Sequence, residues 1–131
     1  MVDFSRDIFL AFARVHVLYH AAEEPIFGTG MMAELRQHGY SLGPGTIYPL
    51  LHRLEGDGLL DCRPEVAGGK VRKYYTITKR GQAELNAIGP KLAELAGEVL
   101  PHPDSLAKGA SSKHSRRRQI PGRARSRVTA C

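Results

Sequence analysis

The chain has 131 residues, of which 42% are hydrophobic, and carries a formal net charge of +6. This length suits one modest domain with a core and leaves no room for the scaffold and cavity of a large enzyme. No apolar run reaches the roughly 18 residues of a membrane-spanning helix, and the start MVDFSRD carries acids where a secretory signal carries bases, so we expect a cytoplasmic protein with no membrane partner.

The first predicted element is a helix over residues 4–22. Its apolar residues almost surround the helix, so we expect it to be covered from more than one side, in part by something other than its own domain. We assign three of these residues to the interface of a homodimer, namely Ile8, Phe12 and Val15.

Two histidines of this helix suggest a metal site. His16 and His20 are four residues apart and therefore share one face. They could bind a divalent transition metal, as an effector, if an acid or a further histidine from the partner chain or from around Glu34 and His38 completed the ligand set. The alternative is that local hydrogen bonds satisfy both imidazoles on an interface helix. We expect no required cofactor.

Two shorter helices follow. The stretch EEPIFG interrupts the chain, and Met31 begins a second helix that ends near Gly39. A third helix spans residues 44–56, and Pro44 suits its first turn because that position has no intrahelical N–H bond to lose. The third helix has a polar face opposite a single apolar stripe, which consists of Ile47, Leu50, Leu51 and Leu54.

After residue 58 the pattern becomes that of a β-hairpin and then of a helix. LLDCRPEV and VRKYYTIT have the composition of strands, and the two glycines of AGGK between them permit a turn with positive φ. Thr78 is a suitable N-cap for the last helix. Apolar residues recur along this helix as in the seam of a coiled coil, which predicts a dimer contact through Leu85, Ile88, Leu92, Leu95 and Val99.

This order of elements is typical of a winged helix-turn-helix, here an α+β and mainly helical fold with a C-terminal dimerisation helix. In such folds the third helix enters a major groove of DNA, and the hairpin lies along the backbone. We predict that the polar face of the third helix and the basic hairpin bind DNA through Thr46, Tyr48, Pro49, His52, Arg53, Lys70, Arg72, Lys73 and Tyr74.

Plainer interpretations of the same residues stay open. Tyr48 could be a half-buried aromatic residue that packs beneath the hairpin. Arg53 could pair with Glu55 or Asp57, although such surface pairs are weak. The bases at the hairpin tip could belong to an ordinary solvated turn.

Three stretches resemble, in order and spacing, the PadR family of bacterial transcriptional regulators: LYHAAEEPIFGTGMMAEL, GYSLGPGTIYPLLHRLEGDGLL and VRKYYTITKRGQAEL. The resemblance covers roughly residues 6–100. It implies a homodimeric winged-helix repressor that binds double-stranded DNA at a palindromic operator and is released by an effector. A single C-terminal helix is similar to the short subfamily. The chain departs from some relatives in having no Trp, which does not support a tryptophan-lined drug pocket.

We divide the chain into three parts. Residues 1–80 form the DNA-binding domain, whose first helix also lies at the dimer interface, and residues 81–100 form the dimerisation helix. Residues 101–131 hold eight Lys or Arg against one acid, a net charge of +7, which leaves −1 for residues 1–100. We expect this basic tail, which lies outside the family pattern, to be disordered and to bind nucleic acid without specificity.

The sequence favours a sequence-specific transcriptional regulator, a dimeric repressor relieved by a small molecule or a metal. The alternative is a winged-helix module that binds another protein instead of DNA. An enzyme is not expected, because the chain has no nucleophile motif, P-loop, GxGxxG or HExxH sequence.

Overall fold

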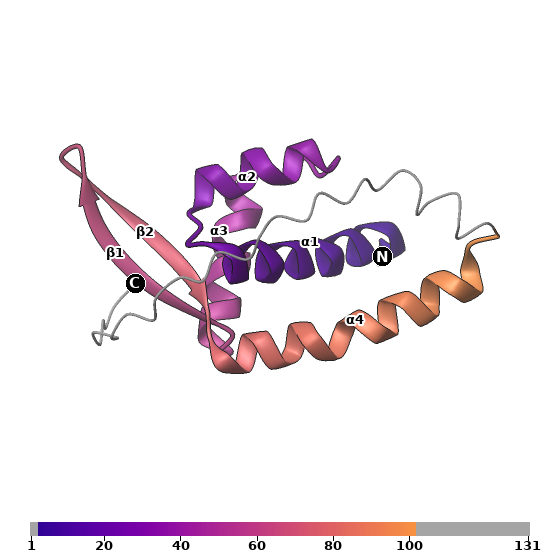
Figure 1. Ribbon diagram of the computed structural model, residues 1–131. Coiled ribbons are helices and arrows are strands. Elements are labelled where there is room, and N and C mark those ends of the chain that lie inside the picture. The colour runs from indigo at the N-terminus through magenta and orange to yellow at the C-terminus, as the bar shows by residue number, and fades with distance from the viewer. Residues whose placement is uncertain (1–2, 102–131) are drawn as a thin grey trace.

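The structure, a computed structural model, describes residues 3–101. Its elements, in chain order, are α1 (Phe4–Glu23), α2 (Gly28–Gln37), α3 (Pro44–Gly56), β1 (Leu60–Ala67), β2 (Lys70–Ile77) and α4 (Lys79–Val99). The first three helices lie together at the base of a long hairpin, and α4 runs beside α1 and away from the hairpin (Figure 1). This mainly helical α+β arrangement is the predicted one. Most of the predicted basic tail, residues 102–131, lies outside the described residues.

α2 begins three residues earlier than the sequence predicted, at Gly28 instead of Met31. Gly28 and Gly30 look like chain breakers, but in the fold aromatic rings fill the space beside them. A Cβ added at Gly28 would collide with the Tyr48 ring, and one added at Gly30 would lie 2.9 Å from the Phe27 ring. The two glycines therefore serve close packing inside a helix, a role that their local sequence does not reveal.

The hairpin has the turn that its glycines predicted. Gly68 and Gly69 occupy the left-handed region with φ of 59° and 79°, which is the type I′ pattern that matches the twist of antiparallel strands. The strands pair without a bulge from Leu60 opposite Ile77 to Ala67 opposite Lys70. Both strands lie within one residue of their predicted bounds.

One backbone contact that the sequence did not predict joins the hairpin to the helices. Ile26, between α1 and α2, forms an antiparallel bridge with Tyr75 of β2. The two amides exchange hydrogen bonds of 2.9 and 2.7 Å with the two carbonyl oxygens. Tyr75 also pairs with Cys62 of β1. The single residue Ile26 therefore adds a third chain segment to the sheet.

The core lies between the first three helices and the base of the hairpin. It contains the whole predicted stripe of α3, and its largest fully buried side chain is Tyr75, at 1% exposure. The buried core residues are Ala13, Val17, Leu18, Ala21, Ile26, Met31, Leu35, Ile47, Leu50, Leu51, Leu54, Leu60, Cys62 and Tyr75. Within residues 3–101, no helix is long and apolar enough to cross a membrane.

The first turn of α4 is fastened to the loop after α3. Thr78 caps α4, as predicted, because its hydroxyl oxygen accepts a 2.9 Å hydrogen bond from the Gly81 amide. The same hydroxyl donates a 2.7 Å hydrogen bond to the Gly58 carbonyl oxygen, and the Thr78 amide donates a hydrogen bond to the Leu59 carbonyl oxygen. Gly81 is buried so closely against this loop that an added Cβ would collide with the Leu59 carbonyl oxygen.

We therefore expect Gly81→Ala to lower the free energy of unfolding by about 1–3 kcal/mol, because the clash is with backbone, which cannot rotate away. Gly97→Ala is the matched control. Gly97 lies in the same helix with nothing within 4 Å of an added Cβ, so alanine there should raise stability by about 0.5–1 kcal/mol through its higher helix propensity. Chemical denaturation measures both changes. Equal effects of the two substitutions would contradict the packing of α4 on the loop.

Candidate nucleic-acid interface

The outward face of α3 is uncovered in the chain. Tyr48, Pro49, His52 and Arg53 are all exposed, and together they line a shallow depression on the surface. An added Cβ at Gly45 would meet nothing within 4 Å, so the surface beside Gly45 is open. The inward face of α3 is fully used by the core, and the outer face is available to a partner.

Thr46 and Tyr48 are partly engaged by the fold. Thr46 is half-buried. The Tyr48 ring packs over Gly28 at the start of α2, yet the residue keeps 39% of its surface. Tyr48 therefore fits both interpretations that the sequence left open, because its ring packs within the chain while the residue remains exposed to a partner.

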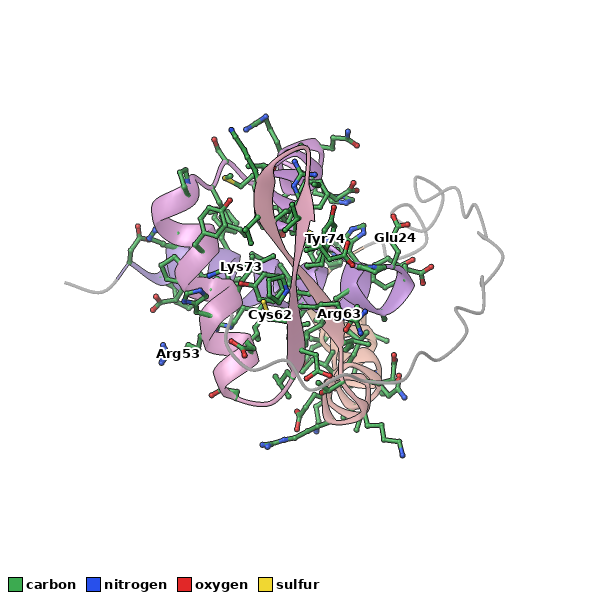
Figure 2. The ribbon with its side chains drawn as sticks, turned by 90° about the vertical axis from the view of Figure 1, so that its left-hand side faces the viewer. Glu24, Arg53, Cys62, Arg63, Lys73 and Tyr74 are labelled. Carbon is green, nitrogen blue, oxygen red and sulfur yellow. The ribbon has the colours of Figure 1, made fainter. Side chains whose placement is uncertain are left out.

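The hairpin bases fall on both faces of β2. Alternation along a strand places Lys70, Arg72 and Tyr74 on one face and Lys73 on the other, together with the buried Tyr75. Figure 2 shows Lys73 on the α3 side of the hairpin and Tyr74 on the opposite side. The predicted set of hairpin residues therefore does not form one continuous patch.

Phe27 is a residue of this region that sequence reasoning missed. Its ring packs edge-on against Tyr74, with ring centres 5.5 Å apart, and lies 4.2 Å beneath the Arg72 guanidinium carbon. This cation–π contact ties the Arg72 side chain to Phe27, in the connection between α1 and α2. The sequence signal was a lone aromatic residue within EEPIFG, which read as a connecting loop.

The lysine and arginine side chains of α3 and of the hairpin have no acidic partners in the described part of the chain. There, the ion pairs are confined to Glu34 with His20 and with His38. Arg53 thus pairs with neither Glu55 nor Asp57, and its charge is available to an anion. Exposed, unpaired bases are the groups that neutralise phosphates when a protein binds nucleic acid.

A second surface, on α1 and α4, is apolar and uncovered in the single chain. Ile8 is 36% and Phe12 37% exposed on α1, whereas Val15 is half-buried. On α4, four of the predicted seam residues are 36–61% exposed, namely Ile88, Leu92, Leu95 and Val99. The fifth, Leu85, packs against the core of its own chain.

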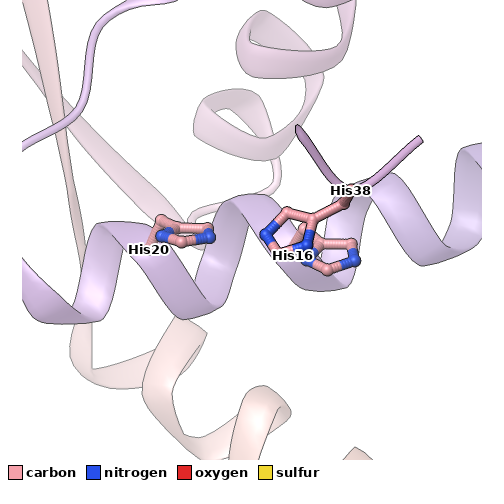
Figure 3. A group of neighbouring side chains, drawn as sticks. All are labelled: His16, His20 and His38. Carbon is pink, nitrogen blue, oxygen red and sulfur yellow. The ribbon is translucent and has the colours of Figure 1, made fainter. Parts of the chain in front are cut away.

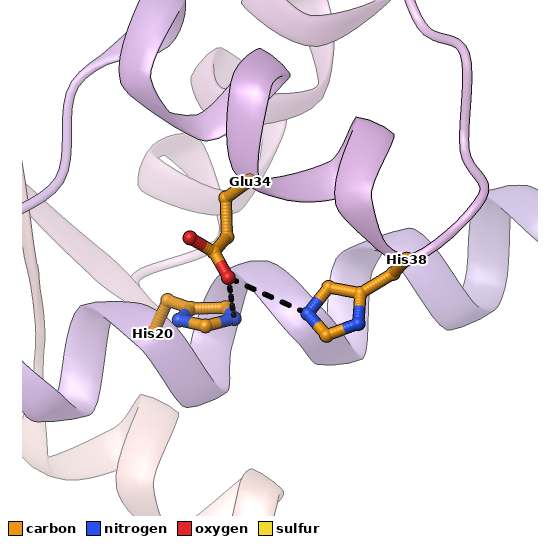
Figure 4. Close-up of polar contacts among 3 residues, drawn as sticks. All are labelled: His20, Glu34 and His38. Carbon is orange, nitrogen blue, oxygen red and sulfur yellow. Dashed lines mark ion pairs between the residues drawn. The ribbon is translucent and has the colours of Figure 1, made fainter.

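The fold brings together the histidines that the sequence singled out. One nitrogen from each of His16, His20 and His38 lies within 4.8 Å of the others, and Figure 3 shows the three rings along one side of α1. Glu34 of α2 reaches the same cluster, with its Oε2 atom 3.7 Å from Nε2 of His20 and 3.5 Å from Nε2 of His38 (Figure 4). We call these four residues the histidine cluster.

The surroundings of the histidine cluster favour neutral imidazoles on α1. Burial lowers the pKa of His16, and the neighbouring His38 and His20 lower it further, against the opposing effect of Glu34. Burial also lowers the pKa of His20, where Glu34 opposes the shift. A neutral imidazole keeps a nitrogen lone pair available as a metal ligand.

Comparison with known proteins gives a consistent set of relatives. The PadR-like family model of transcriptional regulators matches residues 17–87. The transcriptional regulator Rv3488 of Mycobacterium tuberculosis is 45% identical over 95 residues, which are 72% of this chain and 89% of that protein. The chain is thus similar to transcriptional regulators over nearly all of its described length.

Solved structures share the fold. A PadR family transcriptional regulator from Eggerthella lenta is 29% identical, with a TM-score of 0.62 over 82% of this chain and 95% of that chain. Bacillus subtilis PadR in complex with operator DNA is 24% identical, with a TM-score of 0.52 over 56% of this chain and 45% of that chain. At 24% identity, the similarity to the Bacillus subtilis structure shows a shared fold and no more.

From the exposed face of α3 we expect Arg53→Ala to weaken binding to the DNA that the protein recognises by about 1–3 kcal/mol, through loss of a charge-assisted contact. Its unfolding midpoint should not change, since the Arg53 side chain is exposed and has no ion-pair partner within residues 3–101. Arg14→Ala, which removes an exposed arginine from α1, is the matched control and should have a smaller effect. Fluorescence anisotropy with labelled DNA measures the affinities. Equal losses in the two variants would contradict a specific role for α3.

Proposed function

Since the chain belongs to the PadR-like family of transcriptional regulators, we propose that it is a dimeric repressor that reads a palindromic operator and is released by an effector. The family assignment makes the chain a DNA-binding regulator and not an enzyme. The finer proposal of a dimer that reads an operator depends on the two exposed surfaces described above. It also places the protein in the cytoplasm, with the DNA.

One observation above all supports the DNA-binding role of α3. The outer face of this helix is exposed, and its arginine has no ion-pair partner within residues 3–101. Thr46, Tyr48, Pro49, His52 and Arg53 are the residues that we propose to enter the major groove. A neighbour with the same fold is described as a complex with operator DNA, which agrees with this assignment.

The hairpin and the tail contribute phosphate contacts in this proposal. Lys70 and Lys73 are exposed on opposite faces of β2. The strand can therefore lie along a DNA backbone with a lysine side chain on either side. Arg72 and Tyr74 lie on the Phe27 side, where they brace the hairpin. The basic residues 102–131 add attraction for any nucleic acid, because phosphate contacts carry no sequence information.

The apolar surface of α1 and α4 supports the proposed dimer. A row of apolar side chains with the spacing of a coiled-coil seam is left without cover on α4. Exposed apolar patches of this kind mark interaction sites, and a second copy presents the same row. Two copies related by a two-fold axis would present two α3 helices to the two halves of a palindrome.

We expect the purified protein to protect a palindromic sequence in the DNA upstream of its own gene, where a footprint would locate it. Affinity for that site should fall steeply with salt, because each base that neutralises a phosphate adds about 0.9 to the slope of log affinity against log salt. Titrations at several salt concentrations measure the slope. A module that binds another protein instead would give no footprint, and any residual affinity for DNA would be the same for every sequence. That result would contradict the proposal.

For the dimer we expect Leu95→Asp to give monomers in analytical ultracentrifugation, because it places a charge in the apolar seam. Ala93→Asp puts the same charge on an exposed position of α4 away from the seam and should leave the dimer intact. Leu95 is 48% exposed in the single chain, so the first three helices and the hairpin should stay folded in the monomer, and circular dichroism should show at most a loss of helix from the later turns of α4. An unchanged dimer in the Leu95→Asp protein would rule out the α4 seam.

A further inference from the structure

We propose that the histidine cluster is a binding site for a first-row divalent transition metal, with His16, His20 and His38 as nitrogen ligands and Glu34 as an oxygen ligand. The ligands come from two helices that the metal would join, since His16 and His20 lie on α1, Glu34 lies on α2, and His38 directly follows α2. Occupation of the site then acts as the effector signal, a consequence that rests on the proposed function.

The distances are close to those of a bound metal. A zinc–nitrogen bond of about 2.0–2.1 Å limits two ligands of one ion to roughly 4.2 Å apart, and the three imidazole nitrogens lie within 4.8 Å of one another. The His16 and His38 rings are stacked, with centres 4.4 Å apart, so their lone pairs must turn toward a common point. Rotation about the last side-chain bond of histidine is soft, so turning of the rings supplies part of this closure, and a small approach of α2 to α1 supplies the rest.

The choice of metal follows from the ligand chemistry. Three imidazoles with one carboxylate suit Zn²⁺ or its neighbours Co²⁺ and Ni²⁺, whereas Mg²⁺ and Ca²⁺ favour sets of oxygen ligands. The local charge is favourable to a cation, because Glu23 and Glu24 act on His20 in addition to Glu34.

Aromatic rings flank the histidine cluster, and solvent can reach it. Tyr40 packs edge-on against His16, with ring centres 5.3 Å apart, and Tyr19 packs in the same way against His20 at 5.2 Å. These rings restrict the imidazoles to the cluster. A pocket of about 160 Å³ between α1 and the start of α2 opens beside His20 and Glu34, which gives an ion a path to the ligands.

The position of the site suggests how a metal could alter DNA binding. α1 carries part of the proposed dimer surface, and α2 packs against α3. Drawing the ligands together would fix the angle between α1 and α2 and thereby shift α3 relative to the dimer axis. A dimeric reader is sensitive to such a shift, because its two recognition helices must match the half-site spacing.

The binding experiment uses the full chain after a chelator has removed any metal. Co²⁺ binding is followed by visible absorption, and Zn²⁺ binding is followed by calorimetry. We expect about one ion per chain and the intense visible absorption of tetrahedral Co²⁺. His16→Asn and His38→Asn should each lower the affinity at least about tenfold, since even the loss of an outer partner of a metal ligand has that effect. Absence of the Co²⁺ spectrum in the parent protein would overturn the site.

Controls separate the cluster from other histidines and from loss of structure. His52→Asn on α3 and His102→Asn with His114→Asn beyond residue 101 should leave Co²⁺ binding unchanged. The metal-free variants should match the parent in circular dichroism and in melting temperature, and the cluster variants should lose the rise in melting temperature that Zn²⁺ gives the parent. Co²⁺ binding that survives in His16→Asn and His38→Asn would overturn the assignment of ligands.

The regulatory consequence has its own readout. We expect Zn²⁺ to weaken operator binding of the parent protein by about 5- to 150-fold, the usual range of coupling between two sites, and to leave the His38→Asn protein unaffected. Metal binding with unchanged operator affinity would overturn the effector role while the site itself stands. A protein that binds metal but no DNA would instead contradict the proposed function, so the two failures are distinguishable.

Discussion

The position of the hairpin relative to the helices depends on the burial and double pairing of Tyr75. Its backbone pairs with Cys62 on one side and with Ile26 on the other, and its side chain is the largest that the core buries completely. Burial raises the pKa of its hydroxyl, and Glu55 and Tyr48 of α3 raise it further. One residue thus ties β2 to the α1–α2 connection and places its phenol close enough to α3 for Glu55 and Tyr48 to act on it.

The sequence predicted α3 and the hairpin well because their determinants are local. The stripe of Ile47, Leu50, Leu51 and Leu54 needs only helical periodicity, and Gly68 and Gly69 are the pair that a tight turn requires. The bridge at Ile26 was not predictable in this way, since a single paired residue has no period. The start of α2 was also missed, because Gly28 looks like a breaker until the ring that covers it is known.

The candidate sites divide along the same line. Exposure of His52 follows from its place opposite the stripe and that of Arg53 from its place beside it, so the sequence could assign both to an outer face. The split of Arg72 and Lys73 between two faces of β2 follows from strand alternation, but the use of Arg72 against Phe27 depends on tertiary packing. Spacing likewise paired His16 with His20, whereas the nearness of His38 depends on how α2 packs against α1.

The uneven attachment of α4 has a consequence for how the protein responds to its own abundance. The first turn is fastened through Thr78 and Gly81, and Gly81 is the sole buried residue of the helix within one chain. Beyond that turn, helical structure gains little from its own chain, and two heptads are too short to be stable alone. In the proposed dimer, order in α4 and association with a second copy would form one equilibrium, so the folded fraction able to bind an operator would rise with protein concentration. A regulator that dimerises in this way would have an operator occupancy that increases more steeply than the number of chains made.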